Sequence, residues 1–251
     1  MRRLLTTLLS FSLCAAVVAD AAVIVSNTWD YGAEGWNIIA DDGGAAFGTL
    51  SDPAVLGGRN ALRVTGPGAP EQYDADFVFS GGFAGDWTSM GTGSDQTVRS
   101  IRFDFYAGAG GAVDHPAGLR LYFEAAGEHV WYYTFDVESL SSGWNFLYAN
   151  LNADSPSNLY GGTWWSETRT ADDWAGDFGS VTDVGLWQAY QSGAGYDSQI
   201  YGLDHFELHD QIYIPEPGTW LMLGFVFLSM AVIFRKRLEE LAVQAWARIR
   251  S

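Results

Sequence analysis

One long segment of the sequence carries the side chains best suited to holding a sugar. It runs from Asn152 to Ser180, which is too long for a hairpin turn, and polar residues surround its tryptophans. Sugar rings pack their C–H faces on tryptophan or tyrosine, while their hydroxyls bond to carboxylates, amides and guanidinium groups. The candidate ligand-binding residues in this segment and just after it are Trp164, Trp165, Trp174, Tyr190, Arg169 and Asp172, with Trp187 and Asp173 nearby.

The same aromatic residues have an alternative role, which is to fold inward and cover the open end of a hydrophobic core. Trp187 lies in step with the alternating residues of a predicted strand, which favours packing on a sheet or in the core. For Trp164 and Trp165 the sequence does not distinguish ligand binding from core packing. The exposure of their side chains would decide between the two.

Catalytic motifs are missing from the sequence. No E-x-D-x-x-E run occurs, the spacing that sets two carboxylates about 5 Å apart in retaining glycosidases on sandwich folds. G-x-S-x-G, H-E-x-x-H and a Gly-rich phosphate loop are also absent. On a strand, His205 and His209 would lie on one face but roughly 13 Å apart, too far to share a metal ion. We therefore expect no catalytic residues and a protein that is not an enzyme, with a polysaccharide hydrolase as the alternative.

The charge of the central region narrows the possible partners. Residues 22–214 contain six arginines, no lysine and 26 acidic residues, a net charge of −20. Such a surface repels the phosphates of nucleic acids and of anionic lipids, so we expect neither as a partner. It suits divalent cations or neutral ligands. Nine tryptophans and twelve tyrosines in this region indicate a folded core.

The elements that would position these side chains are β-strands. Apolar and polar residues alternate in runs that are separated by Gly, Asp and Ser, the pattern of half-buried antiparallel strands. We therefore expect an all-β fold, a two-sheet antiparallel sandwich or jelly roll of about eight to ten strands. A second long loop is expected from Ser80 to Thr97. The alternating runs are Gln72–Phe79, Ile101–Tyr106, Leu119–Glu124, Trp131–Val137, Trp144–Tyr148, Val181–Trp187 and Ile200–Leu208.

The first residues have the pattern of a secretory signal peptide. Arg2 and Arg3 precede an apolar run, and small residues lead to a predicted cleavage after Ala21. Cys14, the chain's one cysteine, falls inside this segment, so the mature protein has no disulfide. We expect residues 1–21 to be the signal peptide and residues 22–213 to form the exported sandwich.

The C-terminal part combines a rigid break, an apolar helix and a basic cluster. The helix 219–234 would span about 24 Å, short of the roughly 30 Å hydrocarbon core, and the cations hold its end in the cytoplasm. This order is similar to the PEP-CTERM sorting signal of Gram-negative bacteria, which here covers residues 214–237. The matching residues are Pro215, Glu216, Pro217, Gly218, Arg235, Lys236 and Arg237.

The PEP-CTERM resemblance implies a route and a partner. An exosortase, a membrane-embedded protease, acts near the Pro-Glu-Pro, so the helix would anchor the protein in the inner membrane only transiently. The protein would then reach the cell surface or the exopolysaccharide matrix of a biofilm. Residues 238–251 depart from the family pattern, because apolar residues continue there at helical spacing. We expect a short amphipathic cytoplasmic tail.

A second resemblance concerns the exported region. Residues 26–37, SNTWDYGAEGWN, and 201–208, YGLDHFEL, resemble the opening and closing segments of carbohydrate-binding modules and galactose-binding-like jelly rolls. In those families an acid near the first strand and an Asp of the last strand share a structural calcium, which would here involve Asp30 and Asp204. The alternative is that both are ordinary surface or turn acids.

Together these patterns predict an exported, surface-sorted, non-catalytic sandwich protein. We expect it to be associated with a polysaccharide matrix or to bind carbohydrate. A surface polysaccharide hydrolase and a purely structural surface protein are the alternatives.

Overall fold

The computed structural model describes most of the predicted sandwich. The described residues are 22–29, 35–67, 70–71, 74–91, 97–108, 115–157, 162–193, 195–196 and 199–213. The predicted signal peptide, Asp30, the sorting motif with its apolar helix 219–234, and the tail 238–251 all lie outside them. Within the described ranges, no helix is long and apolar enough to cross a membrane.

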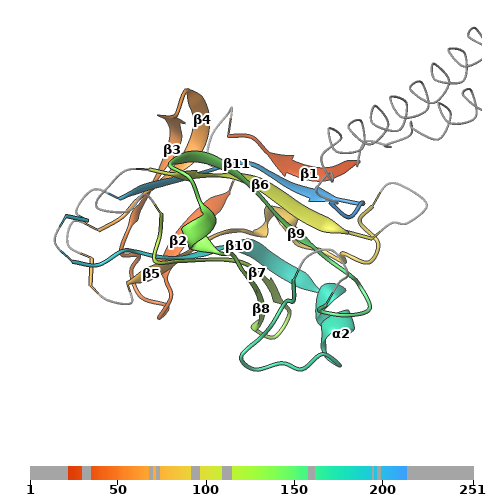
Figure 1. Cartoon of the computed structure of the whole chain (residues 1–251). Helices are drawn as coiled ribbons and strands as arrows, with labels where there is room; N and C mark the ends of the chain where they lie inside the picture. The colour runs from red at the N-terminus through yellow and green to blue at the C-terminus, as the bar shows by residue number, and fades with distance from the viewer. Residues whose placement is uncertain are drawn as a thin grey trace, which may run out of the picture. The chain divides into compact units, whose positions relative to one another are not determined.

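Two antiparallel sheets form the fold, as the alternation predicts, and Figure 1 shows them as stacked layers. The six-stranded sheet has the order β3 (Thr49–Leu56), β4 (Arg59–Thr65), β11 (Ile200–His209), β6 (Ser100–Ala107) and β9 (Gly143–Asn150), with β1 (Val23–Asn27) paired to β11. The five-stranded sheet has the order β2 (Trp36–Ala40), β5 (Ala75–Ser80), β10 (Val181–Ala189), β7 (Gly118–Ala125) and β8 (His129–Thr134).

The core lies between the sheets and follows from the alternation of the strands. In β6, Ile101, Phe103 and Phe105 are buried while the residues between them face outward. In β7 the inward residues are Leu119, Leu121 and Phe123. Burying one side chain of this size stabilises a fold by roughly 1.5–3 kcal/mol. The alternating side chains therefore fix which face of each strand is left to solvent.

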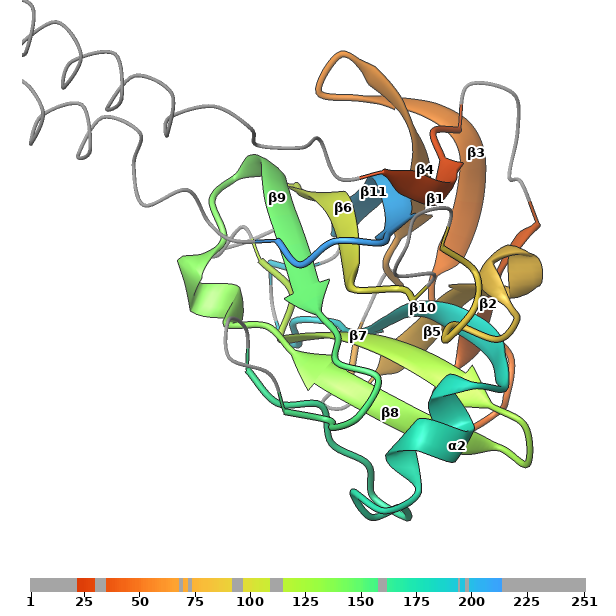
Figure 2. The same cartoon turned by 90° about the vertical axis from the view of Figure 1, so that its right-hand side faces the viewer.

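The long segment between β9 and β10 closes one end of the sandwich. It contains the short helix α2 (Trp174–Phe178), which lies beside β7 and β8 in Figure 2. The Trp174 ring meets the rings of Trp131 and Phe123 at centroid distances of 4.9 and 5.4 Å, and Trp164 lies 5.5 Å from Phe123. This segment therefore extends the core.

The structure departs from the predicted strands at several points. The predicted strand Trp131–Val137 is too long, because β8 ends at Thr134 and a 3₁₀ turn, η2 (Val137–Ser139), follows; the Asp136 carboxylate caps it by accepting from the Glu138 N–H. A second 3₁₀ turn, η1 (Gly81–Phe83), follows β5. None of the seven predicted runs covers β1, β2, β3 or β4. The described residues form eleven strands, one more than expected.

Residues 22–213 contain a complete hydrophobic core. The buried residues of the core cluster all lie between Trp29 and Leu208, and both sheets are formed from this part of the chain. We therefore expect this fragment to fold without the C-terminal segment, and we use it in the experiments below.

Candidate functional site

The outer face of the five-stranded sheet carries aromatic side chains where a surface strand would ordinarily carry polar ones. Cross-strand register places these residues in two adjacent rows, each crossing all five strands. The first row is Asn37, Phe79, Gly185, Tyr122 and Tyr132, and the second is Ile39, Phe77, Trp187, Arg120 and Thr134. We call the residues of these two rows the aromatic face.

A hollow of about 160 Å³ opens on the aromatic face. Its lining includes Phe77, Phe79 and Tyr122, together with the acids Asp41 and Glu124. Phe77 and Tyr122 meet edge to face, with their ring centroids 4.8 Å apart. Ligand pockets for drug-sized molecules run from about 300 to 1,000 Å³, so this hollow suits a single sugar ring.

Gly185 lies in the middle of the first row, between Phe79 and Tyr122. The backbones of β5 and β10 approach so closely here that a Cβ on Gly185 would collide with the Val78 carbonyl. The strand therefore needs glycine at this position, and the central strand offers no side chain in this row. The neighbouring aromatic rings form the surface instead.

Arg120 covers the other part of the aromatic face. Its guanidinium carbon lies 4.2 Å from the ring centroid of Trp187, 5.0 Å from that of Trp165 and 5.6 Å from that of Tyr132. Each such cation–π contact is worth about 0.5–2 kcal/mol, depending on exposure. A ligand reaching these rings would meet their edges and the guanidinium rather than free ring faces.

Trp165 joins this face through a backbone bridge between the long loop and the sheet. Its amide and carbonyl pair with Tyr132 at 2.9 and 2.7 Å, and its indole N–H donates to Thr134 Oγ1 at 3.1 Å. Trp187 also lies here, half-buried, and its indole N–H donates to Asp41 Oδ2 at 3.4 Å. Of the aromatic residues predicted to bind a ligand, Trp165 therefore reaches the face, and Trp187 beside it packs on the sheet as expected.

Three other predicted binding residues lie in the core. The exposed fractions of Trp164, Trp174 and Tyr190 are 1%, 0% and 2%. The two indoles donate to the carbonyls of Asn150 and Asn152, and the Tyr190 hydroxyl donates to Asp76 Oδ2 at 2.6 Å. A surface ligand cannot touch these side chains, so we remove them from the candidate site. The alternative expectation, core packing at the open end of the sandwich, describes them correctly.

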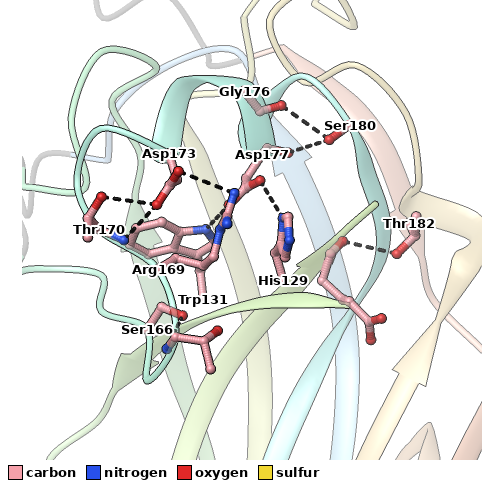
Figure 3. A network of polar contacts seen from close by, with 12 residues as sticks. His129, Trp131, Ser166, Arg169, Thr170, Asp173, Gly176, Asp177, Ser180 and Thr182 are labelled. Atoms are coloured by element: carbon pink, nitrogen blue, oxygen red, sulfur yellow. Dashed lines mark hydrogen bonds and ion pairs between the residues drawn. The ribbon is translucent and has the colours of Figure 1, made fainter. Parts of the chain in front are cut away.

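Arg169 belongs to a polar network that fastens the long loop to β8 (Figure 3). The network is centred on Asp177, which is 5% exposed and accepts from His129 Nδ1 and Trp131 Nε1, both at 2.9 Å. Arg169 contacts Asp177 Oδ2 at 3.4 Å and Asp173 Oδ1 at 3.3 Å. Arg169 is therefore engaged within the loop.

The two acids near Arg169 differ in their surroundings. Asp173 accepts hydrogen bonds from the backbone and hydroxyl of Thr170, which lower the pKa of its carboxyl. Asp172 is exposed and is not among the residues that line the hollow.

Two acids stand directly opposite one another at the rim of the aromatic face. Glu124 of β7 pairs in register with Asp183 of β10, so both carboxylates point outward side by side. Partial burial raises the pKa of the Glu124 carboxyl, and the charges of Asp183 and Glu128 raise it further. Burial also raises the pKa of Asp183. We call Glu124 and Asp183 the rim acids.

Asp204, the predicted calcium ligand of the last strand, lies on the outer face of the other sheet. It is 1% exposed and pairs in register with Asp104 of β6. His205 Nδ1 lies 2.8 Å from Asp204 Oδ2, and Arg59 Nη1 lies 2.6 Å from Asp104 Oδ2 and 4.0 Å from Asp204 Oδ2. Burial raises the pKa of Asp204. We call these four residues the ion cluster.

The described donors of the ion cluster do not fit calcium. Ligand atoms of Asp104, Asp204 and His205 lie within 4.8 Å of one another, but calcium takes six to eight oxygen ligands and this set includes an imidazole nitrogen. The Arg59 guanidinium already supplies positive charge at the same carboxylates. Asp30, the other predicted ligand, lies outside the described residues.

Sequence reasoning missed most of the residues of the aromatic face. Phe77, Phe79 and Tyr122 were assigned to strands but not to a site, and the rim acids were not singled out. A usable signal was present: in the runs Gln72–Phe79 and Leu119–Glu124, aromatic residues occupy solvent-side positions of the alternation. An aromatic side chain at such a solvent-side position indicates a surface that binds another molecule.

Comparison with known proteins gives matches among solved structures only. No protein-family model matches the chain, and a search of curated proteins found no match. An exo-beta-agarase structure matches with a TM-score of 0.46 and 13% identity, over 81% of this chain and 26% of that one. The first of the matched structures, PfGH50B, is covered over 24% of its length, so the chain spans about a quarter of these two proteins.

Two carbohydrate-binding modules are matched over nearly their whole length. The xylan-binding domain CBM22-1 of Paenibacillus barcinonensis Xyn10C matches with a TM-score of 0.36 and 14% identity, over 77% of this chain and 97% of that one. A family 29 module matches with a TM-score of 0.38 and 12% identity, over 76% and 98%. These similarities are too low to assign a function, which has to be inferred from the chain's own residues.

Proposed function

We propose that this protein is a non-catalytic carbohydrate-binding sandwich that holds a glycan on its aromatic face. The observation that carries the proposal is the hollow lined by Phe77, Phe79 and Tyr122 beside the acids Asp41 and Glu124. Aromatic rings supply the surface for the C–H face of a sugar, and the carboxylates accept from its hydroxyls. The small volume favours one ring in the hollow, with the rest of the glycan crossing the sheet.

Figures 1 and 2 show where this face lies in the fold. The five-stranded sheet forms one outer layer of the sandwich, and the helix α2 lies toward one end of β7 and β8. The described part of the long loop meets the sheet through the bridge from Trp165 to Tyr132. A glycan held in the hollow would therefore cross the strands of this sheet with the loop at one side.

The polysaccharide hydrolase is the second candidate, because the rim acids are a pair of adjacent carboxylates. A glycosidase needs one carboxyl group that stays protonated and another that stays ionised, so the environments must separate their pKa values. Here burial raises the pKa of both Glu124 and Asp183. Neither direction assigns an acid and a base, and the aromatic lining of the hollow favours binding. Product release from a polysaccharide, lost in Glu124→Gln, would reverse that conclusion.

We also propose that the protein is exported and sorted through its C-terminal signal. The proposal rests on the signal-peptide pattern of residues 1–21 and on the Pro-Glu-Pro, apolar and basic parts of residues 214–237. An exosortase-type protease is the expected partner, and the cell surface or an extracellular polysaccharide matrix is the expected destination. Mass spectrometry of the mature protein should find an N-terminus at Ala22 and a C-terminus near Pro215. An intact C-terminal helix on the mature protein would contradict the sorting proposal.

Glycan arrays with the fragment 22–213 test the binding proposal. We expect Phe77→Ala to weaken binding by about tenfold or more, because removing an aromatic platform loses roughly 1–3 kcal/mol of contact. Phe146→Ala is the matched control, since Phe146 is 50% exposed on β9 of the other sheet. If no glycan binds, the structural surface protein becomes the better account. Equal loss in both variants would show that the aromatic face is not the site.

A further inference from the structure

The described lining of the hollow on the aromatic face contains two acids and no cation. Among the described residues that line it, Asp41 and Glu124 carry charge, and both are acids. The nearest arginine of the face, Arg120, has its guanidinium over Trp187 and Trp165. The field in the hollow is therefore negative, which attracts cations and repels anionic sugars.

The rim acids add to this negative field. Glu124 and Asp183 face each other across β7 and β10, an arrangement that destabilises a sheet unless a cation lies between the carboxylates. The charged groups that act on Glu124 are the carboxylates of Asp183 and Glu128, and both raise its pKa. Among the described residues, no salt bridge to either rim acid is formed. A cation bound at the rim would remove this repulsion.

Tyr122 provides a separate indication of a ligand. Its side chain is only 4% exposed and lines the hollow, and its hydroxyl is not among the buried polar atoms of the described residues that lack a partner, so this oxygen stays open to the hollow. A phenol in this position can donate to or accept from a ligand. The rings of Phe77 and Phe79, which are half-buried, attract a cation as well as the C–H face of a sugar.

We infer that the hollow selects an amino sugar, with the sugar ring packed on Phe77 and Phe79 and its ammonium group at the rim acids. The natural ligand class would be a polysaccharide of hexosamine units that are at least partly free of N-acetyl groups. This inference rests on the proposed function and narrows it from carbohydrates in general to cationic ones. An ammonium group supplies the missing positive charge. The sugar ring also packs on the aromatic side chains of the hollow, which a bare metal ion would not do.

A pair of chemically matched oligosaccharides tests this inference. One is a β-1,4-linked glucosamine hexamer, which is cationic near neutral pH, and the other is the same hexamer with every amine acetylated. By calorimetry with the fragment 22–213, we expect the glucosamine hexamer to bind about tenfold or more tightly at low salt. Raising the salt concentration should shrink this preference, because partly exposed charges are screened.

The double variant Glu124→Gln, Asp183→Asn should lose the preference, measured as the ratio of its affinities for the two hexamers. The matched control is Asp172→Asn with Glu138→Gln, which removes the same charge from two exposed acids elsewhere. We expect the control to keep the preference of the unaltered protein. Circular dichroism of both variants checks that the sandwich is folded.

Other outcomes separate this inference from the proposed function. Equal binding of the two hexamers would overturn the amino-sugar inference and leave the carbohydrate-binding proposal standing. Equal loss in the rim variant and the control would show an effect of overall charge only, and overturn it as well. Binding of a lysine peptide as tight as that of the glucosamine hexamer would show a general cation site rather than a sugar site. No binding of either hexamer, or of any arrayed glycan, would overturn both proposals.

Discussion

Two pairs of acids occupy equivalent places on the two outer faces of the sandwich, and their surroundings differ. Asp104 and Asp204 stand opposite each other across β6 and β11, while Glu124 and Asp183 stand opposite across β7 and β10. The first pair has Arg59 and His205 within hydrogen-bond reach of its carboxylates. Among the described residues the second pair has no positively charged partner, and Asp183 has a hydrogen bond with the Thr182 side chain.

The difference indicates two uses for the same side-chain arrangement. Like charges that face each other across strands destabilise a sheet, so a cation must compensate them or their carboxyl groups must hold their protons more strongly. In the ion cluster the compensation comes from the chain itself, which allows Asp204 to be 1% exposed. At the rim acids no cationic side chain among the described residues offsets the repulsion between the two carboxylates, so water or a ligand must do so. The first pair is thus structural, and the second is available for binding.

The largest effect is expected from removing the internal counter-charge. Arg59→Met should lower the free energy of unfolding by about 1–2 kcal/mol, because Asp204 is buried while Arg59 is partly exposed. For a domain of this size that corresponds to a fall in melting temperature of roughly 2–8 °C. Thermal unfolding of the fragment 22–213 measures it. An unchanged melting temperature would mean that the ion cluster does not need Arg59.

The rim acids should respond in the opposite direction. Glu124→Gln with Asp183→Asn should raise the free energy of unfolding near neutral pH by a few tenths of a kcal/mol, up to about 1, since both groups are partly exposed and solvent screens their repulsion. Thermal unfolding of the variant and the unaltered fragment, side by side, gives the difference. A destabilised variant would show that the rim acids have partners within the fold.

The pH dependence of this gain follows from the raised pKa values. Because the folded state holds the rim protons more strongly than the unfolded state, ionisation of these groups costs stability as pH rises through their folded pKa values. The double variant should therefore gain most above those values. Its advantage should disappear at a pH below the unfolded values of Glu and Asp, about 4, where both carboxyls are protonated in both states. An advantage that persisted in acid would point to a cause other than charge.

The smallest effect is expected from metal removal. Because Arg59 and His205 already compensate the ion cluster, we expect EDTA to change the melting temperature by less than about 1 °C, since only ligands bound to the folded state shift it. A calcium ion shared by Asp30 and Asp204 is the competing proposal. It would be supported by a fall of several degrees in EDTA that Asp204→Asn abolishes.

The strands were predictable because their pattern is local. Alternating residues in β6, β7, β10 and β11 gave both the fold class and the inward faces. The hairpin of β3 and β4 was missed although Gly57 and Gly58 form its turn with φ angles of 52° and 85°, a conformation that favours glycine. This glycine pair is the signal in the sequence that predicts the hairpin of β3 and β4.

The binding surface was less predictable because it depends on register between distant strands. Glu124 and Asp183 are far apart in the sequence, and only the pairing of β7 with β10 makes them neighbours. The tryptophans of the long loop presented a different difficulty. Trp164 and Trp165 are adjacent and chemically identical, yet one is in the core and the other beside Arg120. Composition cannot distinguish such positions, since the bridge to Tyr132 decides which ring faces outward.

The most direct test of glycan binding on the aromatic face uses the indole N–H signals of three tryptophans. In a proton–nitrogen correlation NMR titration of the fragment 22–213 with the glucosamine hexamer, we expect the Trp187 and Trp165 indole signals to shift. Trp187 donates to Asp41 of the hollow, and Trp165 lies on the same face. The Trp144 indole lies on the other sheet, where it donates to the Leu56 carbonyl, and should stay in place. A shift of the Trp144 signal with Trp187 and Trp165 unchanged would contradict the assignment of the site to this face.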